Sequence, residues 1–359
     1  MHRFLALAVF VVGCGPQSDL AQSRGRLVTS RPALKPNVMV LFDRSGSMLL
    51  PVEPSDPNCP SGCGNSASNT CPTTCPTRLS EAKRALGDFF AHSSASARVG
   101  LTLFPTDNLC GPPTNVQVEL PPSAASDDDL SALEATAFAA NEAVQAVVPS
   151  GGTPTAAALH FVGTLPSLRN TNDGRDEYVV LITDGLPNCN DAHNDQLCSI
   201  ASPTPQQLAA CACTTSTCSG ALCSKGCADT SNAREGIAQL SVGFGIRTVV
   251  IGLGQEVSID VSEFDRLADG AEFGAMRVRK STELTAALDA AMKEITPTTC
   301  SFRMSQLPAN GDQLVGFLDG ARFDPSLMTI KSNGDWVTLD PSLCAAGQRL
   351  DFRIEGPTP

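Results

Sequence analysis

Four continuous apolar runs constrain the fold of this chain more than any other feature. The runs cover residues 38–42, 99–104, 178–183 and 248–253. Apolar residues without polar alternation indicate strands that are buried on both faces, as in a parallel sheet. Between the runs, residues 79–89 and 130–147 place apolar side chains at the spacing of one helix face. Strands that alternate with helices predict an α/β fold with a doubly wound, mostly parallel sheet.

Changes in composition divide the chain of 359 residues into segments. Residues 36–297 hold the apolar runs and are expected to form the α/β domain, which ends in a helix over 281–295. Residues 298–359 are short alternating stretches broken by Gly and Pro, a pattern that predicts a small β module. Residues 14–35 are polar and contain Pro, which predicts a flexible tether in front of the domain.

The start of the chain predicts export. Residues 4–12 form an unbroken apolar run after a short basic start. These nine residues are too few to span a bilayer as a helix, which needs about 20 residues. Residues 1–13 are therefore predicted to be a signal peptide rather than a membrane anchor.

The apolar run ends in the sequence VVGC at 11–14, which resembles the lipobox of bacterial lipoproteins. That resemblance implies cleavage before Cys14 and lipidation of its thiol. The protein is then expected to be exported and lipid-anchored at the bacterial cell envelope, and Gly15 favours the outer membrane. An ordinary signal peptide cleaved elsewhere is the alternative.

The cysteine content agrees with this interpretation. The chain has 15 cysteines, an odd number for an exported protein. Without Cys14 an even set remains, and export favours disulfide bonds within it. The disulfide candidates are Cys59, Cys63, Cys71, Cys75, Cys110, Cys189, Cys198, Cys211, Cys213, Cys218, Cys223, Cys227, Cys300 and Cys344. Zinc or an iron–sulfur cluster in the dense stretch 211–227 is the alternative, although the spacings there do not match paired C-x-x-C ligands.

Most of these cysteines fall in two insertions, at 51–77 and 186–228. Each insertion follows the end of a predicted strand, so both are expected at the sheet edge where the carboxyl ends of the strands meet. The insertions hold four and seven cysteines, so Cys110 is expected to pair with the second insertion. We expect the insertions either to select a binding partner or only to stabilise long loops outside the cell. Cys300 and Cys344 lie near the two ends of the β module and are expected to close it.

Polar side chains follow two of the predicted strands, at the point where each strand ends. The sequence DRSGS at 43–47 follows the first apolar run, and TDG at 183–185 ends the third. Between them, GGTPT at 151–155 begins a predicted helix. Because ligands bind at the carboxyl ends of parallel strands, these loops are expected to converge on one hard-oxygen site for Mg²⁺, with Ca²⁺ or Mn²⁺ as alternatives. The candidate ligands are Asp43, Ser45, Ser47, Thr153 and Asp184.

The D-x-S-x-S turn, the downstream Thr and the strand-end Asp occur in the order that resembles the metal-ion-dependent adhesion site of von Willebrand factor type A domains. The resemblance covers about 37–295 and includes the stretch 264–277. It implies that Ser45, Ser47 and Thr153 reach the metal through their hydroxyls. By the same resemblance, Asp43 and Asp184 act through bound water and hydrogen bonds, and a carboxylate of a protein partner takes the open coordination position.

The resemblance therefore implies adhesion-type, metal-dependent protein binding. The net charge of −12 and the 5% aromatic content argue against nucleic acid as a partner. The sequence has no G-x-S-x-G, H-E-x-x-H or P-loop lysine motif, so it is not expected to be an enzyme. The alternatives are a structural envelope lipoprotein with a scaffold domain that binds nothing through a metal, and an exported hydrolase. The oxygen-rich stretch 188–195 could hold a second cation, although polar loop chemistry explains it equally well.

Overall fold

The chain forms two compact units in a computed structural model. One unit comprises Ala33–Thr298, and the other combines Met1–Pro32 with Thr299–Pro359. The residues described are 26–28, 30–32, 34–127, 129–170, 173–185, 187–189, 229–254, 267–268, 271, 275–278, 283–295, 301–306, 308, 312–330, 336–343 and 350–356. The predicted signal peptide, Cys14, most of the second insertion, Cys300 and Cys344 lie outside these residues, as does most of the stretch 264–277.

A five-stranded parallel sheet forms the centre of the first unit. Its strands are β3 (Asn37–Asp43), β4 (Arg98–Phe104), β5 (Glu177–Thr183), β6 (Ile246–Leu253) and β7 (Ala275–Val278), in the order β4-β3-β5-β6-β7. All neighbouring pairs are parallel. Every residue of β3 and β5 is buried, as the unbroken apolar runs predict. The predicted α/β class is therefore confirmed.

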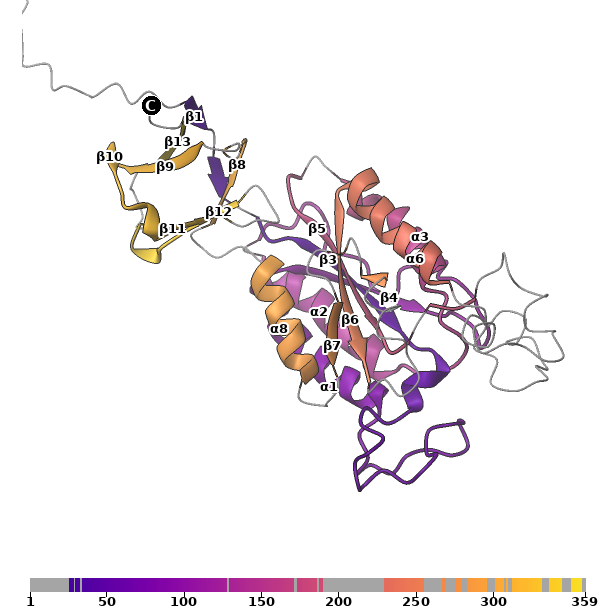
Figure 1. Ribbon diagram of the computed structural model, residues 1–359. Helices are drawn as coiled ribbons and strands as arrows, with labels where there is room; N and C mark the ends of the chain where they lie inside the picture. Colours follow the sequence, from indigo (N-terminus) through magenta and orange to yellow (C-terminus); the bar gives the residue numbers. More distant parts are fainter. Residues whose placement is uncertain are drawn as a thin grey trace, which may run out of the picture. The chain divides into compact units, whose positions relative to one another are not determined.

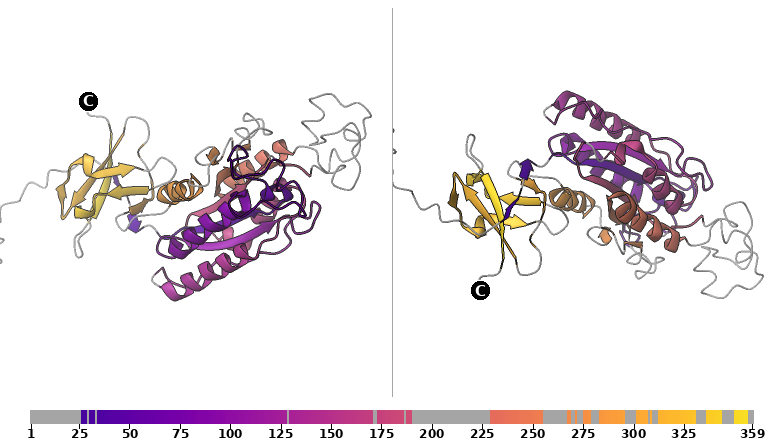
Figure 2. Two further views of the ribbon diagram at one scale, coloured as in Figure 1. Left: turned by 90° about the horizontal axis from the view of Figure 1, so that it is seen from below. Right: turned by 90° about the horizontal axis from the view of Figure 1, so that it is seen from above.

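Helices cover both faces of this sheet (Figure 1). The helices are α1 (Arg78–Ser93), α2 (Leu130–Gln145), α3 (Thr155–Gly163), α6 (Thr230–Ala238) and α8 (Glu283–Ile295). Side chains alternate along β3, so that Val38 and Val40 pack with α1, α2 and α8, whereas Met39 and Leu41 pack with α3 and α6. Figure 2 shows the two helical layers from below and from above.

Shorter helical turns occur in both units. They are the 3₁₀ helices η1 (Gly46–Leu49), η2 (Pro166–Leu168), η5 (Pro325–Leu327) and η6 (Pro341–Leu343), and the π-helical turn η4 (Gln239–Gly243). No helix within the described ranges has both the length and the apolar character that crossing a membrane requires.

The strand order creates a switch point between β3 and β5. The chain leaves β3 towards α1 on one face of the sheet, and it leaves β5 towards α6 on the other face. Neighbouring strands whose connections diverge in this way leave a crevice at their carboxyl ends, where α/β proteins bind ligands. Asp43 ends β3 and Asp184 directly follows β5, so the predicted loops lie at this point.

The second unit is built from two antiparallel four-stranded sheets. The first has the order β1-β13-β9-β10 and the second β11-β12-β8-β2. Their strands are β1 (Arg26–Val28), β2 (Ser30–Pro32), β8 (Ser301–Met304), β9 (Gln313–Leu318), β10 (Ala321–Arg322), β11 (Met328–Ile330), β12 (Trp336–Leu339) and β13 (Leu350–Glu355). Phe352, Leu314 and Val337 are buried in one core that both sheets share.

The predicted tether is wrong for residues 26–32. β1 pairs with β13 and β2 pairs with β8, so this segment belongs to the β module instead of spanning freely between units. The α/β unit is thus inserted between β2 and β8 of the module. Segments of three residues such as RLV and SRP are too short to carry a strand pattern. Their partner strands lie about 300 residues away in sequence, so only the long-range pairing reveals them.

Three disulfide bonds lie among the described residues. Cys59 pairs with Cys75 and Cys63 with Cys71, both within the insertion at 51–77. The third bond joins Cys110 to Cys189, the first cysteine of the second insertion, in agreement with the expected pairing. The sulfurs of Cys63, Cys71 and Cys75 lie within 4.8 Å of one another, but all three take part in disulfides and so do not form a metal site.

Candidate metal centre

Asp43 is the buried centre of the predicted site. It ends β3 and has no exposed surface. Its Oδ1 accepts a hydrogen bond from the backbone N–H of Ser45 at 2.7 Å, and its Oδ2 accepts one from the Thr183 hydroxyl at 2.7 Å. Thr183 ends β5, the strand next to β3. The parallel pairing of the two strands therefore fixes the orientation of this carboxylate.

The hydroxyls of the first loop reach the second carboxylate. Ser45 Oγ lies 3.0 Å from Ser47 Oγ. Both hydroxyls donate to Asp184 Oδ1, Ser45 at 3.3 Å and Ser47 at 2.8 Å. Four of the five predicted ligands thus converge in one network of oxygen atoms, drawn from the two loops on either side of the switch point.

Thr153 is positioned by its backbone. Its N–H donates to Asn188 Oδ1 at 2.6 Å, and its carbonyl accepts from the Asn188 N–H at 3.0 Å. The same loop accepts a hydrogen bond from the Gly46 N–H at the Gly151 carbonyl, at 3.0 Å. Thr153 is buried, but no hydrogen bond joins its hydroxyl to the other four side chains in the described part of the chain. Among the described residues, the loop is therefore held beside the network by its backbone hydrogen bonds.

The glycines before Thr153 are required by close packing. Gly151 has φ +83°, a backbone conformation that residues with a Cβ rarely adopt. A Cβ on Gly152 would lie 2.7 Å from Cys189 Sγ and 2.8 Å from Asn188 Oδ1. The Cys110–Cys189 disulfide and Asn188 thus press directly against the loop that carries Thr153.

A buried cation pairs with Asp184. The Arg78 guanidinium donates through one nitrogen to Asp184 Oδ2 at 3.0 Å and to the Asp184 carbonyl at 3.1 Å. Both side chains are buried. Sequence reasoning missed Arg78, together with Thr183 and Asn188. The available signal was a basic residue in the first turn of a helix, where the helix dipole disfavours it unless a carboxylate lies nearby.

The electrostatics of the site favour a cation. Burial and, to a smaller extent, the charge of Asp184 raise the pKa of Asp43, hydrogen bonds from Thr183 and Ser45 lower it, and the net pKa is about 7. Two buried carboxylates face one buried guanidinium, which leaves negative charge surrounded by oxygen donors. Such a donor set is suited to a hard divalent cation, so the residues present fit the ion that the sequence motif implies.

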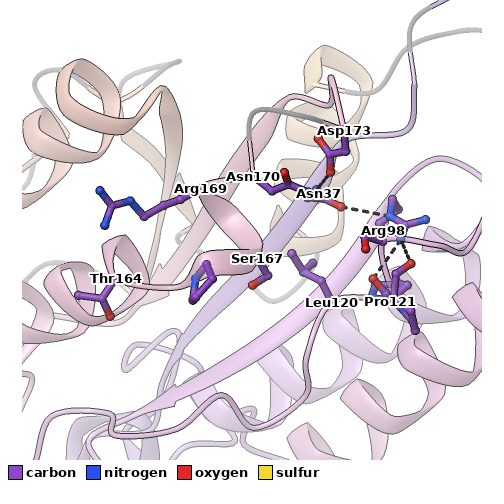
Figure 3. Close-up of a pocket in the computed structure, with 12 residues that line it drawn as sticks. Asn37, Arg98, Leu120, Pro121, Thr164, Ser167, Arg169, Asn170 and Asp173 are labelled. Atoms are coloured by element: carbon purple, nitrogen blue, oxygen red, sulfur yellow. Dashed lines mark hydrogen bonds between the residues drawn. The ribbon is translucent and has the colours of Figure 1, made fainter.

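A cavity of about 690 Å³ lies at the opposite edge of the sheet (Figure 3). Asn37 and Arg98, the first residues of β3 and β4, line it. The Arg98 guanidinium is already bonded to Asn37 Oδ1 and to the carbonyls of Pro121, Pro122 and Ala125. None of the five predicted ligands lines this cavity, so it is separate from the metal site.

Comparison with known proteins finds structural likenesses at low sequence identity. The sequence matches no protein-family model and no curated protein. Among solved structures, the PilB minor pilin from Streptococcus sanguinis is 18% identical with a TM-score of 0.43, over 73% of this chain and 62% of that one. A von Willebrand factor type A protein from Catenulispora acidiphila is 13% identical with a TM-score of 0.38, over 94% and 67%.

The manganese-loaded TRAP protein of Plasmodium vivax is 15% identical with a TM-score of 0.42, over 92% of this chain and 98% of that one. The match to the PilB pilin covers 62% of that chain, so this chain spans less than two thirds of the pilin's length. Likenesses at this distance assign no function, and the site itself has to supply one.

Proposed function

We propose that this protein binds a partner protein through a divalent cation held by Asp43, Ser45, Ser47, Thr153 and Asp184. The α/β unit is then a von Willebrand factor type A domain with a metal-ion-dependent adhesion site. One observation carries the proposal. Both serine hydroxyls reach Asp184 Oδ1 beside the buried Asp43, at the switch point of a parallel sheet.

Each residue has a role that follows from its place. Ser45, Ser47 and Thr153 offer neutral hydroxyls, and Asp43 and Asp184 supply the negative charge that attracts the ion. Thr183 and the Ser45 N–H orient Asp43, and Asn188 orients the backbone of Thr153. When bound, a Mg²⁺ ion with few charged ligands acts as an electrophilic contact for a carboxylate of the partner; Ca²⁺ and Mn²⁺ suit the same oxygens.

We further propose that the protein works outside the cytoplasm, anchored to the bacterial cell envelope through lipid on Cys14. The lipobox-like sequence at 11–14 supports the anchor. The three disulfides support an oxidising compartment. We also propose that the lipid lies in the outer membrane, because Gly15, rather than Asp, follows Cys14.

Binding without catalysis is also part of the proposal. Among the described residues, His92 and His160 are exposed on α1 and α3 and make no contact with the hydroxyls of Ser45 or Ser47. A serine nucleophile needs a general base within hydrogen-bond distance. A hydrolase that activates a serine through histidine therefore finds no support among the described residues.

Calorimetric titration of the oxidised protein with Mg²⁺ tests the proposal. We expect saturable binding by the parent protein, no binding by Asp43→Ala and weakened binding by Ser47→Ala. Asp88→Ala removes an exposed carboxylate from α1 and serves as the matched control, which should bind like the parent.

A partner search with and without chelator then separates the alternatives. We expect the parent protein to capture its partner, and we expect both the chelator and the Asp43→Ala substitution to abolish this capture. Partner capture that survives both would instead establish a structural envelope lipoprotein whose type A domain acts as a scaffold without the metal.

A further inference from the structure

Arg78 is buried, with its side chain in a space that Gly254 leaves open. It is the first residue of α1 and only 5% exposed. Gly254, which follows β6, faces it with φ +107°, and a Cβ there would lie 2.6 Å from Arg78 Nε. A residue larger than glycine at 254 would displace the guanidinium, so the end of β6 is shaped around this cation.

The backbone of Arg78 is held by both ends of the first insertion. Its N–H donates to the Leu50 carbonyl at 2.9 Å. Thr77 caps α1 through a reciprocal pair of hydrogen bonds with Ser80 and forms a bridge with Pro51. The Cys59–Cys75 disulfide closes the loop just before this cap. The insertion at 51–77 therefore delivers Arg78 to the metal site in a fixed position.

The Arg78 side chain forms an ion pair with one of the five predicted ligands, Asp184. Its guanidinium contacts Asp184, and no other ion pair to the five predicted ligands is present in the described ranges. The neighbouring cation in the first loop, Arg44, is bonded instead to the carbonyls of Pro105 and Val148. Arg78 is thus the positive group that the fold places within the network.

We propose that Arg78 is a positioning and specificity-determining residue that weakens metal binding and strengthens the binding of a carboxylate to the bound metal. This inference rests on the proposed function. Arg78 cancels the charge of Asp184, so that the donor set carries one negative charge less. A divalent ion is then held less tightly but retains more positive charge for an anionic partner.

The physical basis is the strength of charge interactions at a buried site. In surroundings of low dielectric constant, fixed charges act on one another far more strongly than in water. The positive charge of Arg78 repels a doubly charged metal ion twice as strongly as a singly charged one. The same charge attracts an incoming carboxylate. A carboxylate that coordinates the metal binds cooperatively with it, and loss of the Arg78 charge should weaken this coupling.

The test measures Mn²⁺ affinity by titration, with and without saturating acetate as a carboxylate probe. In Arg78→Met we expect Mn²⁺ affinity to rise about tenfold, the size of effect that groups behind the direct ligands produce. Acetate should tighten Mn²⁺ binding in the parent and much less in this variant. Arg78→Lys retains the charge and should behave like the parent within about twofold. Arg84→Met, an exposed cation on the same helix, is the matched control.

The outcomes separate this inference from the proposed function. Absence of Mn²⁺ binding by the parent would refute the metal site and with it the role of Arg78. If the parent binds Mn²⁺ and a folded Arg78→Met binds it with unchanged or lower affinity, the proposed role of the Arg78 charge is refuted, whereas the metal site stands. Thermal unfolding in the presence of chelator shows whether each variant is folded. If Arg78→Met does not fold, Arg78→Lys decides, because a loss of affinity or of acetate coupling with the charge retained contradicts the proposal.

Discussion

At the scale of single residues, Glu177 is a buried carboxyl far from the metal site. It is the first residue of β5 and only 8% exposed. Asn37 donates a hydrogen bond to its Oε1 at 3.0 Å, and its Oε2 has no partner in the described part of the chain. Burial, together with the charges of Asp173 and Asp176, raises the pKa of Glu177 to about 8, although the Asn37 hydrogen bond and Arg175 lower it. The folded protein therefore favours the neutral form of this side chain.

This raised pKa predicts how stability changes with pH. The folded state binds the proton more tightly than the unfolded state, so the contribution of Glu177 is complete below about pH 4.5 and is lost as the pH rises through about 8. Glu177→Gln keeps the acceptor for Asn37 and cannot ionise. Its free energy of unfolding should exceed that of the parent by a few kcal/mol at about pH 9, since one pKa unit corresponds to about 1.4 kcal/mol.

Urea unfolding at about pH 5 and about pH 9 measures this difference. Glu134→Gln removes an exposed carboxylate from α2 and should leave the pH dependence unchanged. Parallel pH profiles for Glu177→Gln and the parent would show that Glu177 ionises normally in the folded protein.

At the scale of elements, pattern alone predicted four of the five strands of the parallel sheet, all but β7. Strands β3 to β6 coincide with the four apolar runs because burial on both faces leaves no polar alternation in the sequence. The predicted ligands Asp43 and Asp184 follow from the same logic, since both stand at the carboxyl ends of such runs. Local sequence therefore carries the information for the sheet edge and for most of the oxygen network.

The supporting residues of the site could not be predicted in this way. Arg78, Thr183 and Asn188 contact the network from three different segments of the chain. Their roles depend on where the insertions end and on which strands are neighbours, and those are long-range properties. The strands β1 and β2 were missed for the same reason, because each is defined by a partner near the other end of the chain.

The disulfide between Cys110 and Cys189 links the loop after β4 to the loop after β5. It closes a sequence separation of 79 residues and lies against Gly152. Replacing both cysteines by Ser should lower the free energy of unfolding by about 2–4 kcal/mol, the usual contribution of a bond that closes a long loop. Cation affinity should fall as well, because Asn188 would no longer be held against Thr153.

Thermal unfolding and Mn²⁺ titration of this double variant measure the two effects. Replacing Cys63 and Cys71 by Ser is the matched control, since that bond closes a separation of only 8 residues. The control should retain the cation affinity of the parent. Unchanged affinity in the Cys110/Cys189 variant would mean that the Thr153 loop keeps its position without the disulfide.

At the scale of the whole molecule, the two units are interleaved along the chain. The α/β unit begins after β2 and ends before β8, and these two strands are neighbours in one sheet. In their pairing, Pro32 lies opposite Phe302, so both connections leave the β module at the same end of adjacent strands. The module is therefore complete only when both ends of the chain are present.

Deleting residues 26–32 tests this dependence. The deletion removes β1 and β2 and leaves β13 and β8 without these neighbours. We expect the β module to lose its cooperative unfolding transition, whereas the α/β unit, with its own core, should unfold as before and bind Mn²⁺ with parent affinity. Calorimetric unfolding resolves the two transitions, and an unchanged transition of the module would show that β1 and β2 contribute little.

The adjacent connections also have a mechanical consequence. If a partner pulls on the α/β unit, the tension enters the β module through two strands that are drawn in the same direction from the same end. Each connection ends in a strand that is hydrogen-bonded within the module, so a pull on the α/β unit is resisted at two points. A domain attached by one terminal strand would be held at one point.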